Sequence, residues 1–475
     1  MFGHRRLFLV IQYVIHALLS PIVRRTGCST RIPARMCENA SDVWRACRDR
    51  PGHSKVHRSV HGLVSFPVLI VLLTLVLMLF RPWKISEATA AALGATVLLL
   101  STAVPVGHVP AVIRESGGVL LFLLGMMVLT GIAERARVFD VLAESVVRLA
   151  RGNGRFLYAL VYLLGAIITA VLSLDVTVIV LTPIVYALIV KRHIPAKPYM
   201  FACVFVANIA SLALPMSNLT NLLVFAGRDI DFVSFVATMW LPNLVAAVTN
   251  LLLFFWLFRK EIPAHFATER DHPIHIDSWL LISGAILTIT LTGVMVLGLV
   301  NRPLWWAALA GGCIMLVLAL GTGSTTFRHT VHDVTPSIFV FVIAMTIVVE
   351  GLQRAWLTDQ AIAFPESLPM ALLGSTGLTA IGSNVVNNIP ATVLALGMID
   401  RAPLAIREAL TWGTLVGANI GPALTTYGSL ATMLWLTQLR RRGMHISTAE
   451  YLRISGQTVP LVLLVTGLTL WLVLS

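Results

Sequence analysis

Charged residues are scarce along this chain. Only 12% of its 475 residues are Asp, Glu, Lys or Arg, whereas 57% are hydrophobic. Soluble domains carry about 25% charged residues, so this composition excludes an ordinary soluble protein and indicates a polytopic membrane protein. The chain also lacks the alternation of apolar and polar residues that is typical of membrane-spanning strands. We therefore expect helices and not a barrel of strands.

Cysteines and nucleotide-binding motifs are equally sparse. The five cysteines are Cys28, Cys37, Cys47, Cys203 and Cys313, and no two of them form a CxxC pair or a zinc-ligand spacing. We expect neither a disulfide framework nor a structural zinc. Because Walker A and Rossmann glycine patterns are missing, we expect no cofactor, no enzyme activity and no ATP hydrolysis by the chain itself. Active transport would then need an ion gradient or a partner ATPase.

Acidic residues are outnumbered by basic ones, and the excess is unevenly spread. The net charge is +13, and residues 1–62 alone hold eleven Lys/Arg against three Asp/Glu. Positive charge beside membrane spans marks the cytoplasmic side, which explains this pattern better than nucleic-acid binding does. We predict that residues 1–62 form a basic, poorly ordered extension. This extension and the arginine loop at 440–442 are expected to be cytoplasmic.

Apolar runs follow one another from residue 63 to the end, and many reach the roughly 20 residues that cross a bilayer. The longest polar connection, 259–277, separates a first membrane repeat at 63–258 from a second at 278–475. Residues 118–140 align without a gap with residues 337–359, which supports a repeat. The sequence predicts an all-α polytopic membrane protein of about 10–12 transmembrane segments, some of them re-entrant.

Two stretches interrupt the apolar runs with small, polar and helix-breaking residues. They are ANIASLALPMSNLTNL at 207–222 and GANIGPALTTYGSLATMLW at 417–435. Gly421-Pro422 cannot continue a regular helix, because proline lacks the backbone N–H and clashes with the preceding turn. Irregular backbone at membrane depth is tolerated only where it is buried in protein or lines a cavity. Paired broken segments of this kind indicate a transporter's binding site.

Asp175 is a carboxylate flanked by apolar residues in LSLDVTVIVLTPIV, 172–185. Such a residue is costly at membrane depth and usually marks an ion path or a proton relay, so we predict that Asp175 carries the coupling proton. The alternative is a structural aspartate that caps a helix N-terminus. Glu350 lies four residues before Arg354, and we expect an ordinary ion pair between them on one helix face.

Uncharged amide and hydroxyl side chains also collect in these apolar stretches. Asn387 and Asn388 stand just before Pro390, inside an apolar segment. Such donors and acceptors suit a neutral polyhydroxylated solute or a dehydrated cation; the alternative is a set of helix caps without a ligand. The predicted substrate-binding residues are Asn208, Ser217, Asn218, Asn387, Asn388, Asn419, Thr425 and Ser429.

The segments LDVTVIVLTPIV (174–185), SNLTN (217–221), VNNIPATVLAL (386–396) and 417–435 resemble the arsenite/antimonite efflux permeases. This ArsB family belongs to a wider ion-transporter superfamily. The resemblance implies two inverted structural repeats with re-entrant hairpins and broken helices. It also implies proton-driven expulsion of trivalent arsenic or antimony hydroxides across the inner (plasma) membrane, in some members with a soluble ATPase. Two positions depart from the family pattern: Leu174, where an Asn is frequent, and Ala423, where many members have a polar residue.

Three other functions remain open at this point. A sodium/proton antiporter of the same superfamily would bind cation and proton at Asp175 in competition. A sodium-coupled divalent-anion carrier would use Ser217 and Asn218, although a matching Ser-Asn-Thr is missing from the second half, where Ser429 is followed by Leu430. The third is a membrane scaffold without transport activity. The two paired polar breaks argue against it, because unpaired polar groups in lipid cost free energy and would serve no purpose in a scaffold.

Overall fold

The structure, a computed structural model, describes residues 66–80, 85–228, 230–267, 276–326, 328–330, 334, 336–356 and 364–475. The extension predicted at 1–62 and part of the loop predicted at 259–277 lie outside the described residues. Within the described residues there is no β-strand, and Asn153 and His265 form an isolated bridge. The prediction of an all-α protein is therefore confirmed.

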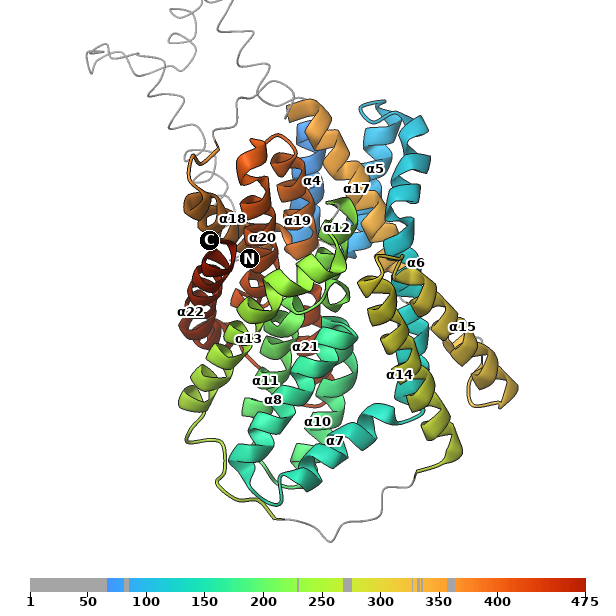
Figure 1. The fold of residues 1–475 in the computed structure, drawn as a ribbon, viewed down its shortest axis with the longest axis vertical. Helices are drawn as coiled ribbons and strands as arrows, with labels where there is room; N and C mark the ends of the chain where they lie inside the picture. The colour runs from blue at the N-terminus through green and yellow to red at the C-terminus, as the bar shows by residue number, and fades with distance from the viewer. Residues whose placement is uncertain are drawn as a thin grey trace, which may run out of the picture. The chain divides into compact units, whose positions relative to one another are not determined.

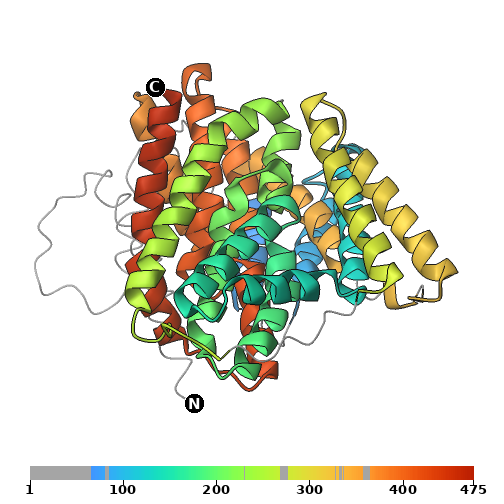
Figure 2. The same cartoon turned by 60° about the horizontal axis from the view of Figure 1, so that its bottom comes forward.

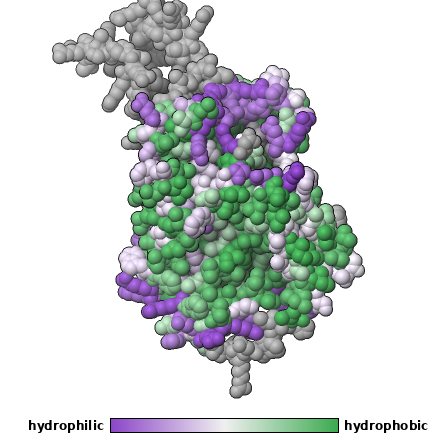
Figure 3. All heavy atoms as spheres, viewed as in Figure 1, coloured by the Kyte–Doolittle hydropathy of each residue, from purple (hydrophilic) through white to green (hydrophobic). Residues whose placement is uncertain are grey.

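One face of the described unit carries an apolar band across its middle. Figure 3 shows hydrophobic residues across its middle and hydrophilic residues toward its two ends. Among the described helices, seven are long and apolar enough to cross a membrane. They include α6 (Val109–Arg135), α13 (Phe232–Leu257), α14 (Ser278–Leu299), α17 (Pro336–Trp356) and α22 (Thr448–Leu474). Shorter helices beside them are α4 (Phe66–Phe80), α5 (Glu87–Leu100) and α15 (Trp305–Gly321), and α7 (Val138–Leu149) is an amphipathic connection.

One end of this unit, where α6 ends and α22 begins, is rich in Lys and Arg, and we call it the basic end. Its loops and helix ends carry Arg137, Arg151, Lys191, Arg192, Arg259, Lys260, Arg440, Arg441 and Arg442. Ion pairs hold these loops together, since Lys197 Nζ lies 2.6 Å from Glu450 and Arg192 lies 2.9 Å from Glu144. The opposite end, which we call the far end, has fewer: Arg228, Arg302, Arg354, Arg401 and Arg407 in its loops and helix ends.

Two helical hairpins enter the unit from opposite ends and stop near its middle (Figures 1 and 2). Hairpin 1 enters from the basic end and hairpin 2 from the far end. Hairpin 1 consists of α8 (Gly154–Val171), α9 (Leu174–Val176), the π-helical segment η3 (Thr177–Leu181) and α10 (Thr182–Lys191). Hairpin 2 consists of α18 (Leu368–Val386) and α19 (Asn388–Ile399). The re-entrant hairpins and their inverted arrangement agree with the predicted fold class.

Beside each hairpin runs a helix that breaks at mid-depth. Break 1 (210–218) follows α11 (Ala196–Ile209), contains two 3₁₀ turns, and leads into α12 (Leu219–Gly227). Break 2 (421–429) follows α20 (Leu404–Ile420), begins with one 3₁₀ turn, and leads into α21 (Leu430–Arg441). Pro215 and Pro422 stand inside the two breaks, where a proline cannot donate the hydrogen bond that a helix needs. Both interruptions predicted from the sequence are confirmed.

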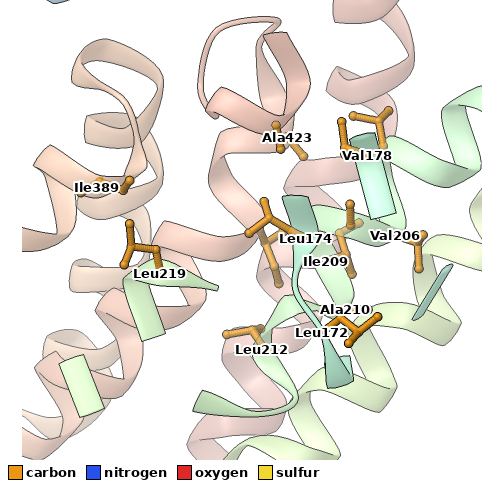
Figure 4. Close-up of a cluster of buried hydrophobic side chains, with 14 of the residues drawn as sticks. Leu172, Leu174, Val178, Val206, Ile209, Ala210, Leu212, Leu219, Ile389 and Ala423 are labelled. Carbon is orange, nitrogen blue, oxygen red and sulfur yellow. The ribbon is translucent and has the colours of Figure 1, made fainter. Parts of the chain in front are cut away.

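Apolar side chains from both hairpins and both breaks fill the space between them (Figure 4). Leu174 comes from hairpin 1 and Ile389 from hairpin 2, while Leu212 and Ala423 come from the breaks, and none is more than 7% exposed. Polar groups among such neighbours have little access to water, so each needs a hydrogen-bond partner within the protein.

Three glycines let α20 pack directly against α18. Gly413 and Gly417 lie one turn apart on one face of α20, and Gly421 follows one turn later at the start of break 2. A Cβ at Gly417 would collide with the Thr376 carbonyl oxygen, and one at Gly421 with Ala380 Cα. Small residues of this kind allow the backbones of membrane helices to approach closely. This contact fixes hairpin 2 against the helix that leads into break 2.

The glycine contact gives a first prediction. Gly417→Ala should destabilise the folded protein by about 1–3 kcal/mol, because two backbones would have to separate. The matched control is Gly377→Ala on the facing helix α18, where an added Cβ meets nothing within 4 Å. The apparent melting temperature of the detergent-solubilised protein measures both variants. A Gly417→Ala variant as stable as Gly377→Ala would contradict the close packing.

Candidate functional site

Asn419, at the end of α20, joins the second half of the unit to break 1. Its Oδ1 accepts hydrogen bonds from the Ser211 hydroxyl at 2.6 Å and from the Asn218 amide at 2.7 Å. Its Nδ2 donates to Asn221 Oδ1 and to the Leu415 carbonyl, both at 2.8 Å. The amide thus makes the four hydrogen bonds available to it, and its side-chain partners are all at most 3% exposed. This network holds the two broken helices together.

Side chains also satisfy the unwound backbone of break 1. Asn221 Nδ2 donates to the carbonyls of Ser211 at 2.7 Å and Leu214 at 3.1 Å. Ser217 Oγ donates to the carbonyl of Ala170 in hairpin 1 at 2.7 Å and accepts from the Leu214 N–H at 3.1 Å. Each of these groups would cost about 1–3 kcal/mol if buried without a partner. Break 1 is therefore fixed to hairpin 1.

Asn384 on α18 makes the corresponding hydrogen bonds at break 2. Its Oδ1 accepts from the Thr425 N–H at 3.1 Å and from the Thr425 hydroxyl at 2.7 Å. Its Nδ2 donates to the carbonyls of Ala380 and Gly421, both at 2.8 Å. One amide thus links hairpin 2 to both sides of the first turn of break 2. Each hairpin is tied to its own break, and Asn419 ties the two breaks together.

Asp175 lies at the tip of hairpin 1, in the single turn of α9. The side chain that caps this turn is Ser173, whose Oγ accepts from the Val176 N–H at 3.4 Å. Asp175 is half-buried, and its carboxylate has no hydrogen bond or ion pair with any residue that the structure describes. The π-helical segment η3 follows at once, and such segments are frequent at functional sites. The geometry does not support the alternative in which Asp175 is a helix cap.

A cavity of about 300 Å³ extends from this tip along α6. Its polar lining residues are Thr130, Glu134, Ser173 and Asp175, and its apolar ones include Phe122, Met126, Met127 and Met216. Phe122 and Glu134 are separated by twelve residues, which is about 18 Å along a helix axis. Glu134 is exposed and lies in the last turn of α6, at the basic end. The cavity therefore leads from the basic end to the carboxylate at mid-depth.

The tip of hairpin 2 carries Asn387 and Asn388. Asn387 has a φ of +77° and is only 7% exposed. This backbone region is sparsely populated by residues other than glycine, and holding one there costs about 1–3 kcal/mol. Asn387 Nδ2 donates to Glu87 Oε1 at 3.3 Å, whereas Asn388 Oδ1 accepts from the Ile389 N–H at 3.0 Å. The buried tip is thus tied to the first turn of α5.

The predicted substrate-binding residues do not form one continuous surface. Asn218 and Asn419 contact each other, and Asn387 and Asn388 lie at the separate tip of hairpin 2. The other four make hydrogen bonds to their own helix, to a hairpin or to a helix start: Asn208, Ser217, Thr425 and Ser429. Glu350 and Arg354 form the predicted ion pair, with a shortest N–O distance of 2.7 Å.

Several polar residues of this region were not predicted from the sequence, among them Asn384, Ser211 and Glu134. Asn384 precedes the noticed Asn387 by three residues, and its position in an apolar run was a signal of the same kind. Ser211 lies inside the noticed stretch 207–222. Glu134 was not predicted either, because nothing in the sequence shows that α6 borders a cavity.

Comparison with known proteins identifies one family. The sequence profile of the family described as arsenical pump membrane protein (ArsB) matches residues 66–473. The arsenical pump membrane protein of Escherichia coli K12 is 28% identical over 403 residues, covering 81% of this chain and 93% of its own length. A putative arsenical pump membrane protein of Bacillus subtilis is 26% identical over 430 residues, covering 84% of this chain and 97% of its own length.

A solved transporter structure has a similar fold. The YdaH transporter of Alcanivorax borkumensis superposes with a TM-score of 0.52 at 15% sequence identity. The match covers 86% of this chain and 98% of that chain. At this level of identity the similarity concerns the fold alone.

Asn384 generates the second prediction. Asn384→Ala removes the partners of two groups of Thr425 and of two carbonyls, so the protein should lose about 2 kcal/mol or more of stability. The control is Thr288→Ala on α14, whose exposed hydroxyl bonds only to the Gly284 carbonyl of its own helix. Thermal unfolding in detergent measures both. Equal stability of the two variants would show that Asn384 does not hold break 2.

Proposed function

Because the chain belongs to the arsenical pump membrane protein (ArsB) family, we propose that it exports trivalent arsenic or antimony hydroxides from the cell, driven by the proton gradient. One observation carries this proposal. The cavity that opens toward the basic end reaches a half-buried carboxylate, Asp175, without a partner among the described residues.

The lining of this cavity suits a small neutral hydroxide. Arsenite at neutral pH is mainly an uncharged trihydroxide, which needs hydrogen-bond partners and no strong fixed positive charge. Ser173 and Thr130 supply hydroxyls, and Met126, Met127 and Met216 supply thioethers, which are soft donors. The cavity volume of about 300 Å³ exceeds the roughly 30 Å³ of one water molecule several-fold, so a small solute fits together with water.

The distribution of charge supports an orientation for the protein. Lys and Arg concentrate on the cytoplasmic side of membrane proteins. The basic end, with Arg192, Lys260 and Arg441 among its residues, would then face the cytoplasm, as expected from the loop at 440–442. In this orientation the cavity is open to the cytoplasm, where the solute is collected, and α22 ends outside.

Asp175 would couple solute export to proton import. A proton arriving from outside neutralises the carboxylate and weakens its hydrogen bonds to solute hydroxyls, which favours release on that side. When the tip of hairpin 1 again borders the cytoplasmic cavity, Asp175 loses its proton and can accept hydrogen bonds from a new solute. Hairpin 1 and break 1 would move as one body in this cycle, because Ser217 joins them.

The proposal is tested with arsenite uptake by everted membrane vesicles, with and without a proton uncoupler. Vesicles containing the protein should accumulate arsenite, and the uncoupler should abolish the accumulation. Proton movement that depends on sodium and ignores arsenite would instead favour the sodium/proton antiporter. Uptake of a dicarboxylate or sulfate with sodium would favour the divalent-anion carrier.

The role of Asp175 gives the third prediction. Asp175→Asn should reduce uncoupler-sensitive arsenite uptake to the level of vesicles that lack the protein, because an amide cannot carry the proton. The control is Asp140→Asn in α7, outside the membrane-crossing helices, which should transport normally. Immunoblots should find both variants in the membrane in equal amounts. Normal uptake by Asp175→Asn would exclude Asp175 as the proton carrier.

A further inference from the structure

Around the tip of hairpin 2, three buried polar atoms have no hydrogen-bond partner within the described part of the chain. They are Asn387 Oδ1, Ser383 Oγ and Thr220 Oγ1. Ser383 and Asn387 belong to hairpin 2, and Thr220 is in the first turn of α12, which packs against α19. Figure 4 shows Leu219 beside Ile389 at this contact. Since buried polar groups are nearly always paired, atoms of this kind point to a bound ligand or water.

The carboxylate of Glu87 determines which atom of the Asn387 amide has no hydrogen-bond partner. An ionised carboxylate can only accept hydrogen bonds, so the Asn387 amide must turn its Nδ2 toward Glu87 Oε1, at 3.3 Å. Asn387 Oδ1 then points away from Glu87. The amide therefore presents a carbonyl oxygen, an acceptor, to whatever lies at the tip.

The main chain of Asn387 is held in one conformation. The Asn387 carbonyl accepts from the Ala391 N–H at 3.2 Å and so starts α19. The φ of Asn387, +77°, is imposed by the turn from α18 to α19, and only 7% of the residue is exposed. With the main chain held in this way, rotation of the amide is the freedom that remains. Glu87 restricts that rotation.

Glu87 lies at the start of α5, close to the tip of hairpin 2. Glu87 is in the first turn of α5, where the helix dipole stabilises a negative charge. Helix α4, which packs against α5, carries no charged residue. On α17, Glu350 and Arg354 flank Gly351, which contacts Leu98. Leu98 is eleven residues, or about 16 Å, further along α5.

We propose that Glu87 is a positioning residue for the solute, holding the Asn387 amide so that Oδ1 accepts a hydrogen bond from a hydroxyl of the transported hydroxide. An acceptor at this point favours a hydroxyl over a deprotonated oxygen, because two oxygens without a proton between them repel each other. This assignment rests on the proposed export of a trivalent hydroxide. It adds hairpin 2 to the solute site and links it to α5.

The test compares the concentration dependence of arsenite uptake in everted vesicles for wild type, Glu87→Gln, Glu87→Asp, Asn387→Ala and the double variant Glu87→Gln/Asn387→Ala. A glutamine at 87 can offer its own N–H to Asn387 Oδ1, so the amide loses its fixed orientation. Glu87→Gln should raise KM about tenfold, the equivalent of one hydrogen bond, while Vmax stays nearly unchanged. The exposed Glu115 on α6 provides the control, and Glu115→Gln should behave as wild type.

Two further results separate positioning from a general structural effect. The double variant should have the same KM as Asn387→Ala alone, because the proposed effect of Glu87 on the solute passes through Asn387. Glu87→Asp, which keeps an acceptor-only side chain, should recover most of the affinity and remains informative if Glu87→Gln does not fold. An unchanged KM in Glu87→Gln, additive effects in the double variant, or a loss of Vmax alone would overturn the assignment. Absence of uptake by wild type would instead overturn the proposed function and this assignment together.

Discussion

Unwound backbone at membrane depth is the constraint on which this structure depends. The bilayer interior holds no water that could form hydrogen bonds with peptide groups outside a helix. Other groups of the protein must therefore form these hydrogen bonds. Three asparagines meet most of this need: Asn221 and Asn384 bond the carbonyls of breaks 1 and 2, and Asn419 joins the two halves. An amide suits this position because it donates and accepts without introducing a charge.

The same arrangement leaves a small number of polar groups available for a solute. Asn384 and Asn419 use their hydrogen-bonding capacity on the protein itself. Asp175, which borders the cavity, and Asn387 Oδ1, at the opposite hairpin tip, have no partner among the described residues. Asn221, Asn384 and Asn419 are thus fixed by contacts within the protein, whereas the Asp175 carboxylate and Asn387 Oδ1 can take a partner from outside it.

Much of the fold could be predicted from the sequence because the signals are local. Pro422 after Gly421 breaks a helix wherever it stands, and Asp175 is conspicuous among apolar neighbours. The contacts could not be predicted, because they join distant parts of the chain: Ser211 and Asn419 are 208 residues apart, and Glu87 and Asn387 are 300 apart. For the same reason, the sequence alone does not show that predicted substrate-binding residues such as Ser217 and Thr425 also make hydrogen bonds within the protein.

Coupling between the hydroxide and the proton at the Asp175 cavity is tested most directly with purified protein in proteoliposomes that contain a pH-sensitive dye. An imposed arsenite gradient should drive protons in the opposite direction in liposomes with the wild-type protein. Liposomes with Asp175→Asn should show no such proton movement. Arsenite flux without any accompanying proton movement in the wild type would contradict the account.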